Sequence, residues 1–345
     1  MTKIKAEIVA DSLSPQGDRL TSLLITFPRI ILAEVNTHRM LSKNTSSSRA
    51  VPFSKMVEAI RNNPFIPIAF QKHHKGMQGT EYMIGEDADQ SKILWEVSKD
   101  EAINTAIDLH NHGVTKQLCN RLLEPFMWTT MLITGSKEGW DNFFELRCPI
   151  YRAFGNVFKS RKECIEKYPA NINLTDLDWL EATESQAEIH MQALAEAIYD
   201  AMRESTPLNL NPGEWHTPFK NKIVDLKEGL TYEEIVKIST AMAARTSYTI
   251  VGDEKEINYE RMIELHDRLI SQDPPHSSPM EHCARAMSEK EYHTFIKGKS
   301  NANWDTDLVT DNTYEISAQF DHNVLGWCRN LKGFIPYRAI IENSN

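Results

Sequence analysis

The chain of 345 residues is short of cysteine, and basic residues are not in excess. Its five cysteines are scattered and no two form a C-x-x-C pair, which argues against a disulfide framework. We therefore expect a reduced, cytoplasmic protein with free thiols. The first residues contain no long apolar run, so the sequence does not predict a signal peptide.

The charge balance makes some partners improbable and leaves others open. With 38 Lys and Arg against 48 Asp and Glu, the formal net charge is −10, so we expect no stable nucleic-acid binding. No segment reaches the roughly 18 consecutive apolar residues that a membrane helix needs, so we expect no membrane insertion. A local cluster of arginines can still bind a small anion against this background.

Hydrophobic patterning predicts both strands and helices. Residues 19–28 are apolar and β-prone, which indicates a strand, and helical periodicity follows Pro28. A long helix is predicted from about residue 89 to residue 112. Residues 274–287 read as a loop entering a helix, whereas residues 150–183 are polar and irregular. Three further amphipathic helices are predicted at residues 184–204, 231–246 and 258–273.

The stretch "NTHRMLSKNTSSSR", residues 36–49, carries the strongest chemical signal. Ser46, Ser47 and Ser48 offer hydroxyls and consecutive backbone N–H groups, and Arg49 offers a planar fork that suits phosphate oxygens. A serine run alone is more often a solvated turn. Arg39 and Arg49 flank this run on both sides, which weakens the interpretation as a solvated turn and keeps a phosphate-binding loop open.

The pattern H-R-x-x-S-x-N-x-x-S-x-R at residues 38–49 resembles the signature of flavin-dependent thymidylate synthases, R-H-R-x-x-S-x-N-E-x-S-x-R. In that family the motif contacts both the flavin and the nucleotide. Thr37 stands where the family has its first arginine, and Thr45 stands where it has glutamate. These two departures leave the identity of the pyrimidine substrate open.

Other stretches resemble the same family. "NRLLEP" contains Arg121, "DNFFELR" contains Asn142 and Arg147, and "SQAEI" resembles the start of a family helix. "AARTSY" and "PHSSPMEH" also match, but they lie about two hundred residues after the signature, whereas family members carry them before it. The order indicates a circular permutation, which is physically cheap where the termini lie close together.

The resemblance implies an α/β fold, with a mixed sheet packed against long helices. It also implies one domain over residues 1–345, with insertions at about 55–95 and 150–183 and an extension at about 295–345. In the family the sites lie between subunits of a homotetramer, so we expect a homo-oligomer here.

The implied activity is methylation of dUMP to dTMP, with FAD as cofactor, NADPH as reductant and methylenetetrahydrofolate as one-carbon donor. Arg147 would be the catalytic residue, since a fixed guanidinium beside the base stabilises the ionised pyrimidine. No metal is implied. The residues implied to bind substrate are Glu34, Ser46, Ser47, Ser48, Arg49, Arg121 and Arg147. The residues implied to bind the cofactor are His38, Arg39, Asn142, Ser247, Ser278 and Glu281.

Three alternatives stay open. Glu34 replaces a neutral amide of the family, and its carboxylate could accept from an exocyclic amine, so dCMP or hydroxymethyl transfer is a second hypothesis. A nucleotide-binding protein without activity is the third; the presence of Arg121 and Arg147 disfavours it. Cys148 follows Arg147, but without a P-C-H setting it reads as a buried bystander rather than a nucleophile.

Overall fold

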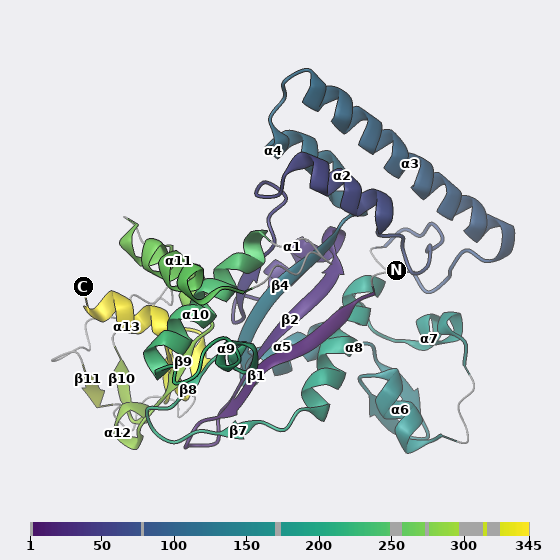
Figure 1. Ribbon diagram of the computed structural model, residues 1–345. Helices are drawn as coiled ribbons and strands as arrows, with labels where there is room; N and C mark the ends of the chain where they lie inside the picture. Colours follow the sequence, from purple (N-terminus) through teal and green to yellow (C-terminus); the bar gives the residue numbers. More distant parts are fainter. Residues whose placement is uncertain are drawn as a thin grey trace.

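A mixed five-stranded β-sheet forms the centre of the computed structural model, which describes residues 3–76, 79–169, 174–248, 257–272, 276–296, 313–315 and 325–344 (Figure 1). The strand order is β3-β4-β2-β1-β7, antiparallel except for the parallel pair β1–β7. The strands are β1 (Lys5–Leu13), β2 (Arg19–Pro28), β3 (Ser42–Thr45), β4 (Trp128–Ser136) and β7 (Leu208–Asn209). This confirms the predicted mixed α/β class and the strand predicted at 19–28.

The helices flank this sheet and extend beyond it. The α-helices are α1 (Leu32–Asn36), α2 (Phe53–Asn62), α3 (Gly85–Asn111), α4 (Lys116–Cys119), α5 (Lys137–Arg147), α6 (Arg161–Lys167), α7 (Asp176–Ala182), α8 (Ile189–Glu204), α9 (Lys220–Val224), α10 (Tyr232–Arg245), α11 (Tyr259–Ser271), α12 (Glu289–Tyr292) and α13 (Tyr337–Ser344). The 3₁₀ turns are η1 (Arg29–Ile31), η2 (Asn120–Phe126), η3 (Thr246–Tyr248) and η4 (Ser278–Glu281).

Alternation along the central strands assigns each helix to one face of the sheet. Leu23 and Ile25 belong to the core cluster with α5 and α8, whereas Leu24 packs with α9, α10 and α11. On β4, Ile133 belongs to the first cluster and Leu132 to the second. Successive strand residues point to opposite faces, so both faces of the sheet are covered and buried.

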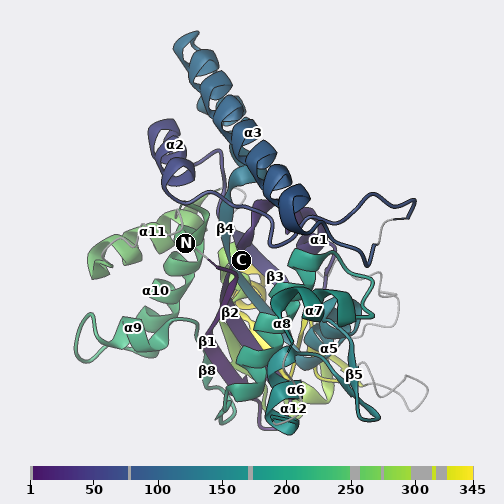
Figure 2. The same ribbon diagram turned by 90° about the vertical axis from the view of Figure 1, so that its right-hand side faces the viewer.

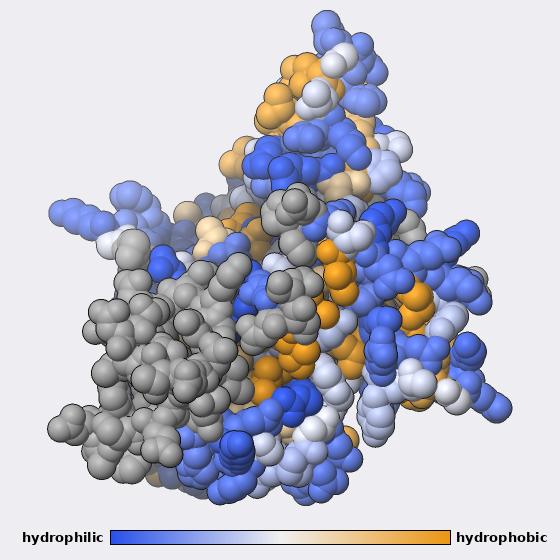
Figure 3. All heavy atoms as spheres, turned by 90° about the vertical axis from the view of Figure 1, so that its left-hand side faces the viewer, coloured by the Kyte–Doolittle hydropathy of each residue, from blue (hydrophilic) through white to orange (hydrophobic). Residues whose placement is uncertain are grey.

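Helices α2 and α3 project from this body together with η2 (Figures 1 and 2). They share a separate apolar cluster that includes Met56, Ile103 and Leu123. The predicted long helix is confirmed, and it begins at Gly85, a few residues earlier than expected. Figure 3 shows hydrophobic residues gathered on this projecting part.

Two predictions about local structure are wrong. Residues 274–287 were expected to enter a helix, but after η4 the chain forms strand β9 (Ala284–Ala286), because it pairs with β8 (Trp215–His216) and β14 (Phe334–Pro336). The described parts of the segment 150–183, residues 150–169 and 174–183, are not irregular: they form the hairpin β5 (Tyr151–Ala153) and β6 (Asn156–Phe158), then α6 and α7. Their own small core, which contains Phe158 and Trp179, stabilises them.

The expected C-terminal extension at 295–345 lies partly outside the described residues. The described part holds β10 (Thr294–Ile296), β11 (Thr313–Glu315), β12 (Trp327–Cys328), β13 (Leu331–Lys332), β14 and α13. Within this part, β14 pairs with β9 and α13 packs beside η4. The described residues of β14 and α13 are therefore built into the same body as the sheet (Figure 1).

A series of hydrogen bonds through two buried histidines joins the five-stranded sheet to the three-stranded sheet of β14, β9 and β8. Ser12 Oγ lies 2.9 Å from His216 Nδ1, and His216 Nε2 lies 2.8 Å from Ser22 Oγ. Ser22 Oγ lies 2.6 Å from Thr134 Oγ1, which lies 2.8 Å from His282 Nδ1. All five side chains are buried, so these bonds replace the water that the polar groups lose on folding.

No helix in the ranges that the structure covers combines the length and the apolar character needed to cross a bilayer.

Candidate active site

Strand β3 organises the residues of the signature stretch. The stretch leaves α1 at Asn36, turns, runs through β3 and ends in the loop that contains Ser46 to Arg49. Because β3 pairs with β4 in register Ser42↔Thr134 to Thr45↔Met131, this edge strand is fixed to the sheet. Four strand residues span roughly 13 Å, so the two halves of the stretch form separate groups at its two ends.

At the first end, Arg147 is held by three side chains. Its Nε donates to His38 Nε2 at 3.0 Å, and its Nη2 donates to Thr37 Oγ1 at 3.4 Å. Its Nη1 lies 3.6 Å from Glu34 Oε2. Arg147 is the last residue of α5, so the helix and α1 together fix the guanidinium. The structure thus brings together Glu34 and Arg147, which the sequence analysis assigned to the substrate, and His38, which it assigned to the cofactor.

His38 is a neutral imidazole at this position. Its side chain is buried and lies edge-on to Phe143, with ring centroids 4.8 Å apart. Burial, followed by the nearby charges of Arg147 and Lys43, lowers the pKa of His38 to about 4. Nε2 accepts the bond from Arg147, so the proton of the neutral ring is on Nδ1.

Glu34 has an unusual environment for a carboxylate. Burial and the neighbouring Glu188 raise its pKa, and Arg147 opposes that shift. Glu188 caps helix α8 by accepting from the backbone N–H groups of His190 and Met191. Two carboxylates therefore approach the arginine end of the site, and only one of them has a guanidinium within ion-pair distance.

A cavity of about 210 Å³ adjoins this arginine group. The predicted cofactor residues Arg39 and Asn142 are exposed, and both line the cavity together with His38 and Arg147. Gly139 lines it as well, because the first turn of α5 packs against residues 40 and 41. The cavity places polar and cationic groups around one opening.

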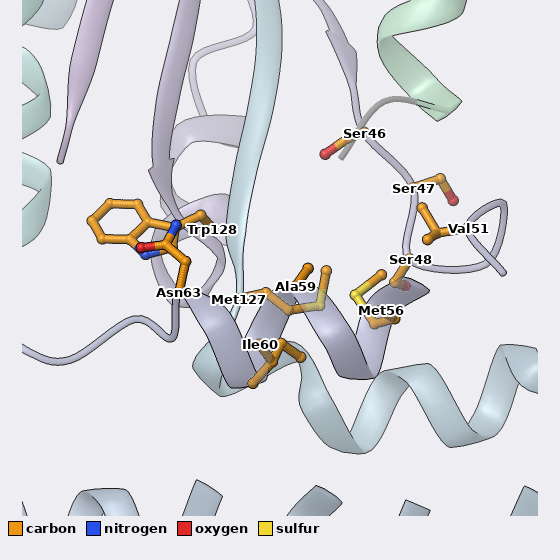
Figure 4. A pocket seen from close by; sticks show the side chains of 10 residues that line it. All are labelled: Ser46, Ser47, Ser48, Val51, Met56, Ala59, Ile60, Asn63, Met127 and Trp128. Atoms are coloured by element: carbon orange, nitrogen blue, oxygen red, sulfur yellow. The ribbon is translucent and has the colours of Figure 1, made fainter. Parts of the chain in front are cut away.

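At the other end of β3, the serine loop turns two of its hydroxyls inward (Figure 4). Ser46 Oγ lies 2.7 Å from Thr129 Oγ1, and Ser48 Oγ donates to Glu124 Oε1 at 2.6 Å. These bonds would have to be exchanged if either hydroxyl bound a phosphate. The pocket beside the three serines has about 30 Å³, which is room for a water molecule and not for a nucleotide.

Arg49 and Arg121 are both exposed near this loop. Arg29 donates to Ser46 O at 2.7 Å and lies 3.4 Å from Glu124 Oε1. Burial lowers the pKa of Arg29. Glu124 opposes this shift, and the like charge of Arg121 adds to it. Three arginines therefore lie at or near the loop end of β3, of which Arg29 pairs with Glu124, and this is a suitable setting for an anion.

The two stretches from late in the sequence reach the same strand. Asn44 Nδ2 donates to Ala243 O at 3.1 Å, and Ser47 N donates to Ser247 O at 2.9 Å. Ser278 and Glu281 lie in η4, which packs against β3. Burial lowers the pKa of Lys43 on this strand to about 8, and Glu281 opposes the shift. Segments about two hundred residues apart thus meet along β3.

The sequence analysis missed the contribution of the C-terminal segment. Arg338 in α13 forms ion pairs with Glu281 and with Glu342, and Asn330 Nδ2 donates to Arg39 O at 3.2 Å. The segment therefore contacts two of the predicted cofactor residues. Its basic and aromatic composition was visible in the sequence, but nothing there indicated which face it would cover.

Cys148 is buried, as the bystander interpretation requires, and burial raises the pKa of its thiol. The remaining four cysteines are also free and buried. Within the described ranges, no group of three or more His, Cys, Asp or Glu side chains is assembled for a metal ion.

The donors of β3, η4, α13 and the arginine cavity suit an anionic cofactor. Arg39, Lys43 and Arg338 supply positive charge, and Asn142 and Ser278 supply an amide and a hydroxyl. Cationic forks and hydroxyls are the groups that bind phosphate oxygens, so these residues fit the diphosphate of FAD. The fit concerns the chemistry of the side chains and defines no position for the group.

Comparisons with known proteins give distant likenesses. No family model matches the chain, and no curated protein matches it. The UMP/dUMP methylase PolB from Streptomyces cacaoi, bound with 5-Br UMP, is 15% identical over 59% of this chain and 90% of that chain, with a TM-score of 0.41. Thymidylate synthase X (ThyX) from Helicobacter pylori, with FAD and dUMP, is 16% identical over 53% of this chain and 67% of that chain, with a TM-score of 0.30. At these values, the proposals below rest on the residues and geometry of this chain.

The buried histidines predict how stability depends on pH. The pKa values of His38 and His216 are lowered to about 4 and that of His282 to about 3, in each case chiefly by burial. The histidines of the unfolded chain have a pKa near 6.5, so between pH 6.5 and 4 the unfolded chain binds more protons than the folded protein. The stability that these histidines contribute is therefore complete above pH 6.5 and decreases as the pH falls toward 4. We expect the melting temperature to fall by about 5 °C or more over this window. A melting series in matched ionic strength checks this; a flat profile from pH 6.5 to 4.5 would contradict it.

Proposed function

We propose that the protein methylates dUMP to dTMP, with reduced FAD, NADPH as reductant and methylenetetrahydrofolate as one-carbon donor. The observation that carries the proposal is the fixed guanidinium of Arg147, which bonds to His38 and Thr37 and lines the cavity beside Arg39 and Asn142. A preorganised cation beside a pyrimidine stabilises negative charge on N3, and this enriches C5 in electrons. The base can then be alkylated at C5 without a cysteine nucleophile.

The chain's own residues bind, orient and neutralise charge. His38, Arg39, Asn142, Ser247, Ser278 and Glu281 would hold the flavin, which supplies the redox chemistry and the transfer of the one-carbon unit when bound. Neutral His38 accepts from Arg147 Nε and Thr37 accepts from Nη2, so the substrate would meet the guanidinium N–H groups that these two bonds leave open. Burial around His38 and Phe143 excludes water from one side of the guanidinium.

The substrate phosphate would bind at the loop end of β3. Ser47 and Arg49 are its first candidates, because the hydroxyls of Ser46 and Ser48 have partners within the chain, and Arg121 lies on the same side. The base-activating and phosphate-binding groups occupy opposite ends of β3, which suits a homo-oligomer whose sites combine groups from different subunits. We propose a homotetramer in which a circularly permuted chain retains the family arrangement.

The test is a visible absorption spectrum of the purified protein with FAD, followed by additions of dUMP and dCMP. The proposal expects flavin bands that dUMP perturbs, and dTMP when folate and NADPH are supplied. Failure to bind FAD at micromolar concentrations would overturn it and favour a nucleotide-binding protein without activity.

Glu34 supports a second candidate, in which the substrate is dCMP or the product is a hydroxymethyl nucleotide. Its Oε2 lies 3.6 Å from Arg147 Nη1, so a carboxylate adjoins the predicted pyrimidine-activating group. A carboxylate accepts from the 4-amino group of cytosine, whereas the O4 of uracil offers it only an acceptor.

Replacing Glu34 with glutamine separates the two candidates. If Glu34 reads cytosine, we expect Glu34→Gln to weaken dCMP binding by about tenfold or more relative to dUMP, because the charged acceptor for the 4-amino group is replaced by a neutral amide that can instead donate to O4 of uracil. Titration calorimetry with both nucleotides measures the ratio. Glu145→Gln, an exposed carboxylate change on the same helix as Arg147, is the matched control. An unchanged ratio would remove the dCMP candidate.

A further inference from the structure

The hairpin formed by β12 and β13 has an arginine at a position that favours glycine. Trp327 pairs with Lys332 and Cys328 with Leu331, so Arg329 and Asn330 are the two turn residues. Arg329 has φ of 57°, in the left-handed region, where a side chain is strained and glycine is not. Gly326 and Gly333, on either side of the hairpin, have φ of 74°. Of these three positions with positive φ, Arg329 is the one that carries a large side chain.

The side chain of Arg329 adds a second cost. It is 12% exposed, and its Nη2 forms an ion pair with Glu342. Its Nε is buried and has no hydrogen-bond partner. A buried N–H without an acceptor is unfavourable, and native proteins keep such groups where a ligand or a functional constraint explains them.

The position of the hairpin suggests what the missing acceptor is. Asn330 donates to the backbone oxygen of Arg39, at the rim of the arginine cavity. Glu342 pairs with both Arg329 and Arg338, and Arg338 pairs in turn with Glu281. The hairpin and α13 are therefore linked directly to the two charged residues predicted to hold the cofactor.

The balance of charge around this network is positive. Lys43, Arg329 and Arg338 supply three cations, whereas Glu281 and Glu342 supply two carboxylates. Each carboxylate already has a guanidinium partner, so a further anion meets an excess of positive charge and N–H donors. A diphosphate supplies both the charge and several acceptor oxygens.

We propose that Arg329 is a binding residue for the diphosphate of the flavin cofactor, presented by the C-terminal hairpin. The inference rests on the proposed function, and it adds a residue from a segment that carries no part of the signature motif. The strained turn is kept because glycine, which the backbone prefers, cannot donate to phosphate.

Replacing Arg329 with glycine should affect stability and FAD binding in different ways. Strain is relieved, so we expect Arg329→Gly to keep or raise the melting temperature. FAD affinity, measured by quenching of flavin fluorescence, should fall about tenfold or more because a charge-assisted hydrogen bond is lost. Arg329→Asn, whose side chain tolerates positive φ, is the second variant if glycine loosens the hairpin. FAD affinity within twofold of the unmodified protein in a folded variant overturns the inference.

Phe154→Gly is the matched control. Phe154 has φ of 49° in the β5–β6 turn and is exposed, so glycine relieves strain there as well. Its FAD affinity should not change. If the unmodified protein binds no FAD, the proposed function fails, and the binding role of Arg329 is then tested with inorganic pyrophosphate. Pyrophosphate binding that Arg329→Gly removes supports an anion site at the hairpin. Absence of pyrophosphate binding overturns the inference.

Discussion

Replacing Arg147 with alanine is expected to lower kcat for nucleotide methylation by about 10²–10³-fold, the usual effect of removing one preorganised charge from a transition state. The guanidinium is fixed by His38 at 3.0 Å and by Thr37 at 3.4 Å, so little reorganisation is needed when charge develops on the base. Flavin binding should persist, because the other predicted cofactor residues lie on α5, η3 and η4 and along residues 38–39. Steady-state turnover and flavin absorbance, measured on the same sample, check both parts.

Two further variants make the Arg147 result interpretable. Arg147→Lys keeps the charge but loses the planar fork, so it should recover only part of the rate. Arg152→Ala removes an exposed arginine that pairs with Glu184 and is the matched control. If Arg147→Ala released the flavin while its melting temperature held, the role of Arg147 would be cofactor binding and not activation of the pyrimidine.

The sheet and its helices were predictable where a periodic pattern coincided with burial. Strand β2 is almost wholly buried, and its run of apolar residues signals a strand without any tertiary information. Strand β9 was not predictable, because Ala284–Ala286 is too short to show alternation and is a strand only through pairing with β8 and β14. Helix α7 had a readable signal in the Thr175 and Asp178 capping box, which the polar composition of the segment obscured.

The candidate site was predictable as a set of residues but not as a shape. The family resemblance assigned His38 to the cofactor and Arg147 to the substrate of one site, and the structure puts these two residues in contact. The same reasoning could not assign partners to Ser46 and Ser48, because their hydrogen-bond partners Thr129 and Glu124 lie about 80 residues away in the chain. Arg329 and Arg338 escaped for the same reason: an ion pair with Glu342 or Glu281 exists only after the C-terminal segment has packed.

Removing the Thr134 hydroxyl is expected to destabilise the protein by about 2–4 kcal/mol. Thr134→Val keeps the shape of the side chain, but it removes the hydrogen bonds to Ser22 Oγ and His282 Nδ1. Ser22 Oγ keeps His216 as a partner, whereas His282 is left buried with no hydrogen bond from either ring nitrogen. Each buried polar group left unpaired costs about 1–3 kcal/mol. Denaturant unfolding measures the loss. Thr134→Ser should retain most of the stability, and Thr130→Val, which is similarly buried on the same strand, should lose less.

His282 stands at one end of this series of hydrogen bonds, so its substitution tests whether the series supports stability and FAD binding. Three hydroxyls and two neutral imidazoles hold five protons for four bonds, so one group at an end has no partner inside the chain. The unused proton is either that of the Ser12 hydroxyl or one on His282 Nε2, and His282 Nε2 is buried without a partner. His282→Asn preserves a donor near Nδ1 and should keep the link to Thr134, whereas His282→Gln places its amide near Nε2 and should not. Because His282 directly follows η4, the second variant should also weaken FAD binding by displacing Ser278 and Glu281. Equal stability and equal FAD affinity in the two variants would show that the link between the sheets does not position the site.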